Sequence, residues 1–432
     1  MAVQEETSVL QTKEKYEAEV RENFKWNGPL GIVQGLMLYL NTGLHNTQVV
    51  IPAFLYEITG SNTFVGIAST IHLYTHNIPQ LFGSALVEHL PVKKKAMIFY
   101  GWLSALSWLA IAASTYFLPR DTNLPIFLFF YGTSAVFMGL YLMVWTDVMS
   151  KVIPVERRGN YFGVRNFLST LVTAAGSSLA GYFIANYLFP NNYVLTYFFG
   201  FVFFALALLL LALTREPVAW RIGQKMSFPE KLRSMPGIFR DDPNFFRFCC
   251  LRAAGAGFCQ MSLPFYIIFA EQRLLGANIG LLVAYLGSTL HISRAVGNLF
   301  WGLVAQKSGY KAPLELSFTI FALAAVIAIF SHSYPTFLLV FIINGLAQAG
   351  LMMSTHNILM EFGQIQNRAT YIGISAAISG LIGGLAPLVG GLLSDYFSFQ
   401  VLFLATACIS VFSTVAMRHY VQDPRHVEMY KL

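Results

Sequence analysis

The stretch RGNYFGVRNFLSTLVTAAGSSLAG, from Arg158 to Gly181, is written twice in this chain. Its second copy is RATYIGISAAISGLIGGLAPLVGG, from Arg368 to Gly391, at a displacement of 210 residues. The first arginine, the tyrosine, the following glycine and the last glycine coincide between the two copies. In both, a charged turn is followed by a long apolar segment rich in small residues. One displacement that holds across a turn and a helix indicates that the second half of the chain repeats the first.

The composition is that of a chain whose surface faces lipid. Of the 432 residues, 56% are hydrophobic and only 11% are charged, whereas soluble proteins carry about 25% charged residues. The apolar runs are long and continuous, which indicates helices, one of the two structures that can span a bilayer. The four cysteines fall in apolar segments and have neither a disulfide pattern nor zinc-ligand spacing. We expect no cofactor.

Twelve apolar segments, each close to the ~20 residues that cross a bilayer, follow a polar tail. The sequence predicts an all-α polytopic membrane protein with twelve transmembrane helices in two pseudo-symmetric six-helix bundles. The predicted spans are 30–57, 62–87, 95–117, 124–147, 160–188, 193–213, 245–270, 278–304, 312–331, 335–360, 369–394 and 399–418. The predicted domains are a tail at 1–28, a bundle at 29–213, a linker at 214–244, a bundle at 245–418 and a tail at 419–432.

Lysine and arginine predict the orientation in the membrane. One set of loops holds 24 of the 28 Lys and Arg residues, whereas the opposite loops hold only Arg120 and Arg273. Because basic loops stay on the cytoplasmic side, we expect both tails to be cytoplasmic. The expected location is the bacterial cytoplasmic (inner) membrane. The net charge of +7 then reflects topology, and we expect no nucleic-acid partner.

Two loops on the basic side share a pattern. They read SALVEHLPVKK, from Ser84 to Lys94, and GLVAQKSGYK, from Gly302 to Lys311. They resemble the loop signature G-x-x-x-D-x-x-G-x-[RK]-[RK] of the major facilitator superfamily. In the first copy a serine and a proline replace the glycines, and in the second Gln306 replaces the acid. The resemblance implies two six-helix bundles joined by a central linker, and transport by alternating access.

The resemblance also implies a gate of charged residues that holds the cytoplasmic side shut while the protein faces outward. We expect Asp147 and Arg158 to be partners of the first loop, and Glu361 and Arg368 to hold the corresponding places beside the second. The alternative is ordinary helix-end charges, worth ~0–1 kcal/mol each when exposed. The predicted gate residues are Glu88, Lys93, Lys94, Asp147, Arg158, Lys307, Lys311, Glu361 and Arg368.

Polar side chains at membrane depth mark candidate substrate contacts, because a charge at the bilayer centre costs ~2.5–3.5 kcal/mol. His72 and His76 lie one helical turn apart, on one face of the second span. In the superfamily helices 1, 4, 7 and 10 line the central cavity, and this resemblance implies that polar residues there face the substrate. The predicted cavity residues are Asn41, His45, His72, His76, Tyr141, Trp145, Arg252, Gln260, His291, Arg294, Asn344 and Gln348.

These residues also have structural interpretations. A single buried histidine is commonly a hydrogen-bonded packing residue, and aromatic side chains could simply fill the bundle. Arg252 and Arg294 either bind cavity anions or extend to the cytoplasmic surface. A histidine cluster could bind a transition metal, but no mid-membrane carboxylate or thiolate accompanies it, so we expect no metal site. Without a mid-membrane acid, proton coupling would run through His45, His72 or His76, since unperturbed histidine has a pKa of about 6.5.

The function predicted from these patterns is transport. We find no phosphate-cradling glycine loop, HExxH motif or nucleophile elbow, so we expect neither an enzyme nor an ATP-driven pump. We expect a monomeric secondary active or facilitative transporter that moves a small organic solute, neutral or anionic, by alternating access with or without protons. The alternative is a non-transporting membrane scaffold or assembly factor on the same fold. A cavity filled by aromatic side chains would favour that alternative.

Overall fold

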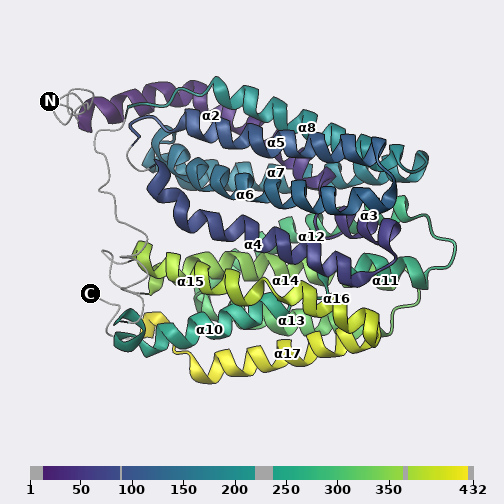
Figure 1. The fold of residues 1–432 in the computed structure, drawn as a ribbon. Helices are drawn as coiled ribbons and strands as arrows, with labels where there is room; N and C mark the ends of the chain where they lie inside the picture. The colour runs from purple at the N-terminus through teal and green to yellow at the C-terminus, as the bar shows by residue number, and fades with distance from the viewer. Residues whose placement is uncertain (1–12, 88–89, 219–236, 363–367, 427–432) are drawn as a thin grey trace.

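The computed structural model describes residues 13–87, 90–218, 237–362 and 368–426. Every regular element in these ranges is a helix. Helices of the first half gather in the upper part of Figure 1 and helices of the second half in the lower part. The predicted all-α fold with two six-helix halves is therefore confirmed. Most of the predicted linker, from 219 to 236, lies outside the described residues, and the predicted domain boundaries stay a prediction.

The twelve predicted spans correspond to consecutive helices or helix pairs. The first half contains α2 (Lys13–Leu44) with α3 (Val50–Thr59), α4 (Asn62–Val87), α5 (Lys94–Phe117), α6 (Arg120–Val152), η1 (Val155–Arg157), α7 (Arg158–Asn186) and α8 (Asn191–Ala212). The second half contains α10 (Pro243–Phe258) with η2 (Leu263–Phe265) and α11 (Tyr266–Arg273), α12 (Ile279–Ser308), α13 (Lys311–Ile329), α14 (Tyr334–Glu361), α15 (Arg368–Gly383) with α16 (Ala386–Tyr396), α17 (Phe399–Tyr420) and η3 (Pro424–His426).

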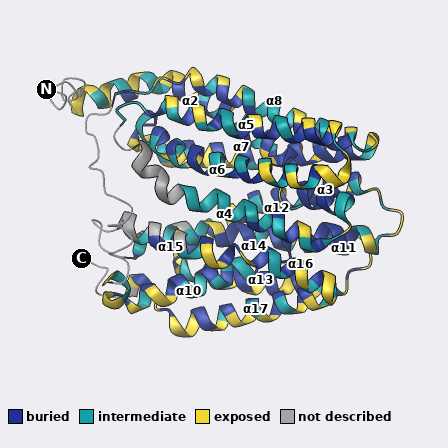
Figure 2. Ribbon diagram, in the orientation of Figure 1, coloured by how far each residue is buried: buried dark blue, intermediate teal, exposed yellow. Residues whose placement is uncertain are grey.

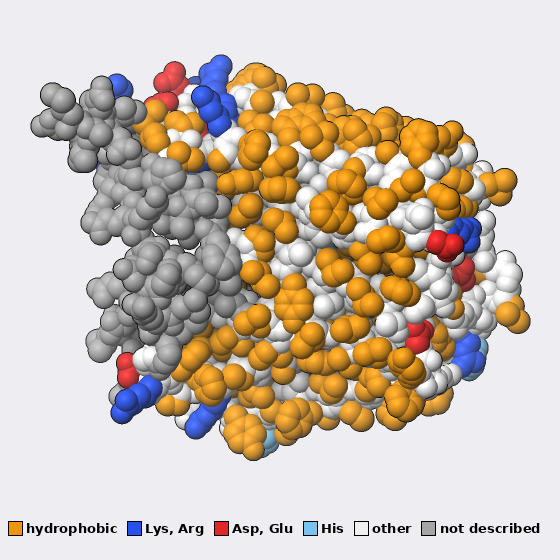
Figure 3. Space-filling model, viewed as in Figure 1, with side chains coloured by type: hydrophobic (Ala, Val, Ile, Leu, Met, Phe, Trp, Pro, Cys, Tyr) orange, Lys and Arg blue, Asp and Glu red, His pale blue; other side chains and the backbone are white. Residues whose placement is uncertain are grey.

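The surface of the bundle suits a membrane. Ten helical segments of the described chain are long and apolar enough to cross one, and the first two predicted spans, which carry many of the polar cavity candidates, are not among the ten. Exposed residues lie on the outward faces of the helices, while buried ones face the interior (Figure 2). Hydrophobic side chains cover the broad face in Figure 3, and charged side chains gather towards its two ends.

Three of the spans predicted as continuous helices are broken, which corrects the prediction. The breaks separate α2 from α3, α10 from α11 and α15 from α16. Each break lies just before a proline, which has no N–H group to bond the carbonyl four residues earlier. In the first two breaks, that carbonyl belongs to Gln48 and to Gln260. The prolines are Pro52, Pro264 and Pro387. A proline alone is not sufficient to break a helix, since Pro79 lies inside the continuous helix α4.

The repeated stretch provides close backbone contacts between the two halves. A Cβ atom at Gly181 would lie 2.4 Å from the backbone oxygen of Gly280, so α7 and α12 cross at touching backbones. A Cβ atom at Gly391, the repeat partner of Gly181, would lie 2.6 Å from the backbone oxygen of Asn62, where α16 crosses α4. Small residues allow such close approach in lipid. The repeat therefore positions two equivalent crossings of the halves.

Among the described residues, the hydrogen bonds that join the halves lie near mid-bundle or on the side away from the chain termini, here called the opposite side. The carboxylate of Asp395 accepts from the hydroxyl of Ser61 at 2.6 Å and from the backbone N–H groups of Asn62 and Thr63 at 3.0 and 2.7 Å. It thereby caps the start of α4 from the other half, as a carboxylate at a helix N-terminus does. The structure is closed on the opposite side.

Each half is also fastened by the same clamp. The side-chain amide of Asn27, in α2, donates to the carbonyl of Arg215 at 2.8 Å and accepts from its N–H at 2.9 Å. The amide of Asn244, in α10, makes the same two bonds to Gln422, at 3.1 and 2.8 Å. Each asparagine begins the first span of its half and binds the segment after the last span. The repeat thus extends to the fastening of each half.

Candidate functional site

The break between α2 and α3 lies against a polar cavity, here called the histidine cavity. Its volume is about 260 Å³. Among its lining residues are six of the predicted ones, from α2, the break, α4 and α12. They are Asn41, His45, His72, His76, His291 and Arg294. The break places His45 and Asn46 there with a backbone that no longer follows the helix. Broken helices of this kind are tolerated at membrane depth where they line a cavity or lie buried in protein.

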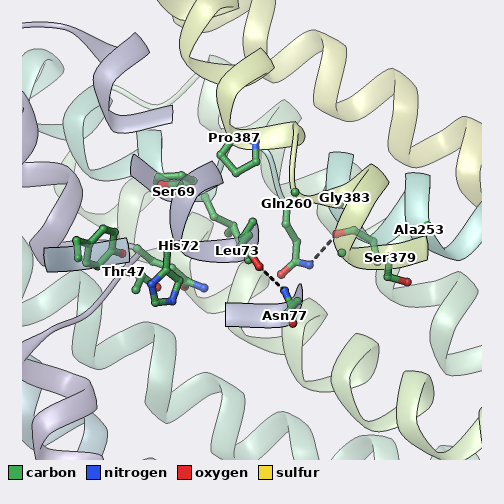
Figure 4. A pocket seen from close by; sticks show the side chains of 18 residues that line it. Thr47, Ser69, His72, Leu73, Asn77, Ala253, Gln260, Ser379, Gly383 and Pro387 are labelled. Atoms are coloured by element: carbon green, nitrogen blue, oxygen red, sulfur yellow. Dashed lines mark hydrogen bonds between the residues drawn. The ribbon is translucent and has the colours of Figure 1, made fainter. Parts of the chain in front are cut away.

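Two further cavities adjoin it. The glutamine cavity, of about 250 Å³, shares Thr47, Gln48 and His72 with the histidine cavity and receives Gln260 from the second half. His72 and Gln260 come from the two halves to this same cavity in Figure 4. The third, here called the terminal-side cavity, has a volume of about 450 Å³ and shares Arg294 with the histidine cavity. It is lined by Tyr39, Gly163, Asn166, Phe167, Thr170, Ala295, Asn298, Leu299, Met352 and Met353, besides Arg294.

His45 is held in one orientation. Its ring stacks on Trp108 with centroids 3.6 Å apart. The Nε2 atom lies 3.2 Å from the carbonyl oxygen of Tyr197, which can only accept, so Nε2 carries the hydrogen. In a neutral ring the Nδ1 atom is then an acceptor, and it has no hydrogen-bond partner among the described residues. Gly200 makes room for the ring, since a Cβ atom there would lie 2.0 Å from Nε2.

Amide side chains join the break to the second half. The Oδ1 atom of Asn46 accepts from the backbone N–H of Gln48 at 2.8 Å, so its amide nitrogen is the group that faces His291. That nitrogen lies 2.8 Å from Nε2 of His291 and donates to it. Gln48 and Gln348 exchange two amide hydrogen bonds, of 3.2 and 3.3 Å. The break is therefore bound to both α12 and α14.

The histidine pair on α4 faces the same space. The rings of His72 and His76 are nearly parallel, with centroids 5.9 Å apart. His72 also stacks on Tyr131 at 4.9 Å, and His76 hydrogen-bonds to the backbone of Ala135. His72 lines the histidine and glutamine cavities together, whereas His76 lines only the former of the two. The predicted shared face of the two histidines is thus observed.

The two predicted arginines occupy different environments. Arg294 lies between the histidine cavity and the terminal-side cavity and lines both. Arg252 lines neither of these cavities nor the glutamine cavity. Its guanidinium instead donates to the hydroxyl of Ser375 on α15 and, at 3.4 Å, to the same residue's carbonyl. Arg252 therefore binds within its own half.

The remaining predicted cavity residues line none of the three cavities. Tyr141 is fully buried and accepts from Gln34 at 3.1 Å. Asn344 is also buried and donates to the carbonyl one turn earlier on α14, at 2.9 Å. The indole ring of Trp145 lies 4.7 Å from the guanidinium of Arg165. These three residues belong to the packed interior of their halves.

Sequence reasoning counted Arg165 among the basic residues of the loops, although it falls within the predicted span 160–188. It lies two turns inside α7 and is only 2% exposed. Its guanidinium lies 5.8 Å from the ring of Tyr39, and its Nε atom donates to the carbonyl of Gly31 at 3.4 Å. A Cβ atom at Gly35 would lie 2.8 Å from Nε. The only sequence feature that could have indicated this packing is the pair of glycines one turn apart in the first span, Gly31 and Gly35, which leave room for a large side chain.

The predicted gate residues act mainly as helix caps within their own half in this conformation. Lys93 binds the carboxylate of Asp147, as expected. The Lys94 ammonium donates to the carbonyls of Ala212 and Thr214 at 2.9 and 2.7 Å, at the end of α8. Arg158, which was expected to be a partner of the first loop, donates to the carbonyls of Ser150 and Ile153 at the end of α6.

The second-half gate residues differ from expectation. Lys311 caps α17 at the carbonyl of Arg418, 3.3 Å away, just as Lys94 caps α8. It pairs with Glu315 at 3.3 Å, and not with Glu361. Lys307 lies in the last turn of α12. Glu88 and the side chain of Arg368 lie outside the described residues.

Sequence reasoning also missed Glu216, which follows α8. Its side chain is 0% exposed, and it pairs with Lys151 at 3.3 Å. The carboxylate accepts the backbone N–H groups of Lys93, at 3.0 Å, and Lys94, at 2.7 Å. It is therefore an anion bound at the N-terminus of α5, where the helix dipole favours it. Its place in a polar linker gave no signal of this burial.

Comparisons with known proteins agree with the fold and the repeat. The model of the Major Facilitator Superfamily matches residues 32–293 and 283–431. Over 103 residues the chain is 34% identical to the minor myo-inositol transporter IolF of Bacillus subtilis (strain 168), which covers 24% of this chain and 23% of that protein. Over 176 residues it is 27% identical to multidrug resistance protein D of Escherichia coli (strain K12), covering 39% of this chain and 43% of that protein. The matches thus span less than half of either relative.

The fold also matches solved structures. The D-xylose-proton symporter superposes with a TM-score of 0.71 at 14% identity, over 92% of this chain and 98% of that one. At this identity the likeness concerns the fold. It agrees with the two helical halves.

Proposed function

This chain belongs to the major facilitator superfamily, and on that premise we propose that it is a secondary active or facilitative transporter of a small organic solute, neutral or anionic. The observation that carries the proposal is the row of three adjoining polar cavities between the halves. Transporters of this kind bind their substrate near mid-membrane between two repeats, commonly at broken helices. Here the broken first and seventh spans bring Gln48 and Gln260 to one cavity.

The state of the bundle supports alternating access. The halves are joined at mid-bundle and on the opposite side, by Asp395 and by the glycine crossings. The terminal-side cavity extends between the halves towards the side of the chain termini. A substrate would therefore enter or leave the site from the side of the termini in this conformation. The basic loops favour the cytoplasm for that side. The bacterial cytoplasmic (inner) membrane is proposed as the location because relatives come from Bacillus subtilis and Escherichia coli.

The residues proposed for substrate contact are those that line the cavities. They are Asn41, His45, His72, His76, Gln260, His291 and Arg294. No carboxylate lines the three cavities among the described residues, so a proton coupled to transport would be carried by histidine. The D-xylose-proton symporter, a structural neighbour, makes proton coupling a reasonable part of the proposal. Three of the proposed gate residues, Lys94, Arg158 and Lys311, cap helices in the present state and would exchange partners in another.

The scaffold alternative receives less support. A cavity filled by aromatic side chains would have favoured the scaffold. Trp108 and Tyr131 instead stack on His45 and His72 and leave open space beside them. A built polar cavity has no evident purpose in a scaffold.

The test is a thermal-unfolding screen of the purified protein against a library of neutral, anionic and cationic metabolites. Each compound that stabilises the protein is then tested for uptake into proteoliposomes. We expect at least one stabilising solute, and its saturable accumulation or exchange. Binding without movement of any stabilising solute would favour the scaffold. The double variant Gln48→Ala with Gln260→Ala should lose uptake while it still reconstitutes.

A further inference from the structure

Arg294 stands at the point where the histidine cavity meets the terminal-side cavity. In the described part of the chain, no carboxylate lines either cavity, and no ion pair involves this guanidinium. The Arg294 side chain is half-buried, and arginine stays charged in proteins, so an anionic partner in the cavity would stabilise it. Its planar fork matches carboxylate and phosphate groups with two parallel hydrogen bonds. An anion that moves from the terminal-side cavity into the histidine cavity would pass this group.

Two residues that line the histidine cavity carry hydrogen-bond acceptors that lack a donor. The Oδ1 atom of Asn41 and the Nδ1 atom of His45 are buried acceptors without a partner among the described residues. The two side chains are only 6% and 5% exposed, so bulk water does not satisfy them. Buried polar atoms in native proteins are nearly always hydrogen-bonded to protein, water or ligand. Since Asn41 and His45 both line the histidine cavity, small side-chain adjustments around a bound ligand would let its hydroxyl groups supply the missing donors.

The space also limits the ligand. The histidine cavity measures about 260 Å³, below the ~300–1,000 Å³ of sites for drug-sized ligands. The rings of Trp108 and Tyr131 are covered on one face by His45 and His72, so little flat aromatic surface remains for a large planar compound. A cation would be repelled by Arg294.

We propose that the substrate is a small hydroxylated organic anion, whose carboxylate or phosphate group binds Arg294 and whose hydroxyl groups donate to Asn41 and His45. This assignment rests on the proposed transport function and adds the chemical class of its substrate. The anionic end lies towards the terminal-side cavity and the hydroxylated end towards the break in the first span. One end of the site binds an anionic group and the other end accepts hydrogen bonds from hydroxyl groups. The two ends can therefore be tested separately.

The probes are three compounds with six carbon atoms. D-gluconate carries a carboxylate and hydroxyl groups, D-sorbitol carries an alcohol in place of the carboxylate, and hexanoate carries the carboxylate without hydroxyl groups. Binding is measured by thermal unfolding of the full chain in phosphatidylcholine nanodiscs. Gluconate should bind at least tenfold more tightly than either of the other two, because each lacks one set of buried partners.

Variants separate the two ends of the site. Arg294→Gln should abolish the preference for gluconate over sorbitol and leave sorbitol binding within about twofold, while Arg294→Lys should keep part of the preference. Asn41→Asp should repel gluconate but still bind sorbitol. The control Arg418→Gln removes an exposed positive charge from α17 and should change nothing. Sorbitol binding in the first and third variants shows that they are folded.

Three results would overturn the assignment. One is equal affinity of the wild type for gluconate and for either of the other probes. Another is an unchanged gluconate preference in Arg294→Gln, and the third is no stabilisation by any probe. If sorbitol is bound and taken up without a preference for gluconate, the substrate class fails and the transport function stands. If no library compound is moved, the transport function itself fails.

A lipid headgroup could offer the same chemistry, since phosphatidylglycerol has a phosphate and hydroxyl groups. The binding measurements are therefore repeated in phosphatidylglycerol nanodiscs. We expect the gluconate preference to persist there. Stabilisation by phosphatidylglycerol that depends on Arg294, with no added effect of gluconate, would assign the site to a lipid and overturn the proposal.

Discussion

Lys151 and Glu361 stand 210 residues apart and end equivalent spans, yet they carry opposite charges. Lys151 pairs with the buried carboxylate of Glu216 at 3.3 Å. Glu361 instead lies near Asp423, which follows the last span of its half and pairs with Arg425 at 3.3 Å. The pKa of the Glu361 carboxyl is raised above its ordinary value, first by burial and then by the negative charge of Asp423, while Arg425 opposes the shift. The repeat therefore conserves the backbone arrangement and not the charges.

This difference predicts a pH-dependent stability that Glu361→Gln would remove. A carboxyl group whose pKa is raised in the folded state destabilises the fold when it is ionised. The loss of stability therefore begins as the pH rises above the ordinary pKa of 4.5, and it is complete above the raised pKa. At pH 7 the variant should unfold at a higher temperature than the wild type. Below about pH 4 the two should unfold at the same temperature, because both states are then protonated. Thermal unfolding from pH 3 to pH 8 measures this.

The matched control is Glu315→Gln, which removes an acid that is paired with Lys311 at 3.3 Å. It should give no gain at pH 7. An unfolding temperature of Glu361→Gln at or below that of the wild type at pH 7 would contradict the prediction.

At the scale of elements, the sequence predicted which segments are helices and that these helices form two halves. Hydrophobic length and the 210-residue displacement were sufficient for this, because lipid requires every span to satisfy its own backbone. The sequence analysis did not predict the breaks at Gln48 and Gln260, although Pro52 and Pro264 are visible in it. Since α4 continues through Pro79, a proline alone does not reveal whether neighbouring helices will re-satisfy the freed carbonyl.

The candidate site was predictable only in part, for a related reason. Polar residues at membrane depth identified His45, His72 and Arg294, which all line the histidine cavity. The same criterion also selected Tyr141 and Arg252. Each of them makes its contacts within its own half, Tyr141 with Gln34 and Arg252 with Ser375. Depth along a helix is readable from sequence. The direction of a side chain depends on how the helix is rotated, and that is set by tertiary packing.

The paired asparagine clamps lead to a prediction for each half separately. Asn27→Ala and Asn244→Ala should each remove two hydrogen bonds to the segment that follows the last span, at a cost of about 1–2 kcal/mol. Amide hydrogen exchange should then accelerate around Arg215 in the first variant and around Gln422 in the second. The effect should be larger for Asn27, which is buried, than for the partly exposed Asn244.

Each variant serves as the control for the other, because the clamps lie in different halves. Faster exchange around both segments in either single variant would contradict independent fastening. Unchanged exchange in both would show that the clamps contribute nothing to local stability.

For the whole molecule, the halves behave as two bodies that share one set of contacts at mid-bundle and on the opposite side. The crossings at Gly181 and Gly391 are backbone contacts that fix where the halves touch. Asp395 adds a charged bond that exists only while those ends are together. A group that interacts with one conformation and not the other shifts the balance between them. Asp395 is thus placed to favour the state described here.

Asp395→Ala should therefore shift the population towards a state that is open on the opposite side. The lost bonds involve an exposed carboxylate and are worth about 1–2 kcal/mol, a change of about five- to thirtyfold. Spin labels at Phe117 and Leu275, both exposed on the opposite side, should move apart in double electron–electron resonance measurements. Labels at Lys95 and Tyr420, exposed near the terminal side, should move closer. The native cysteines are first replaced by alanine, with an unchanged unfolding temperature as the requirement.

The control Asp121→Ala removes an exposed acid from the first turn of α6, on the same side of the bundle. It should leave both distance distributions as they are. Opposite changes in the two label pairs distinguish a tilt of the halves from loss of structure, which would broaden both distributions. Unaltered distances for both pairs in Asp395→Ala would mean that the glycine crossings alone hold the opposite side shut, and the carboxylate would then be only a cap for α4.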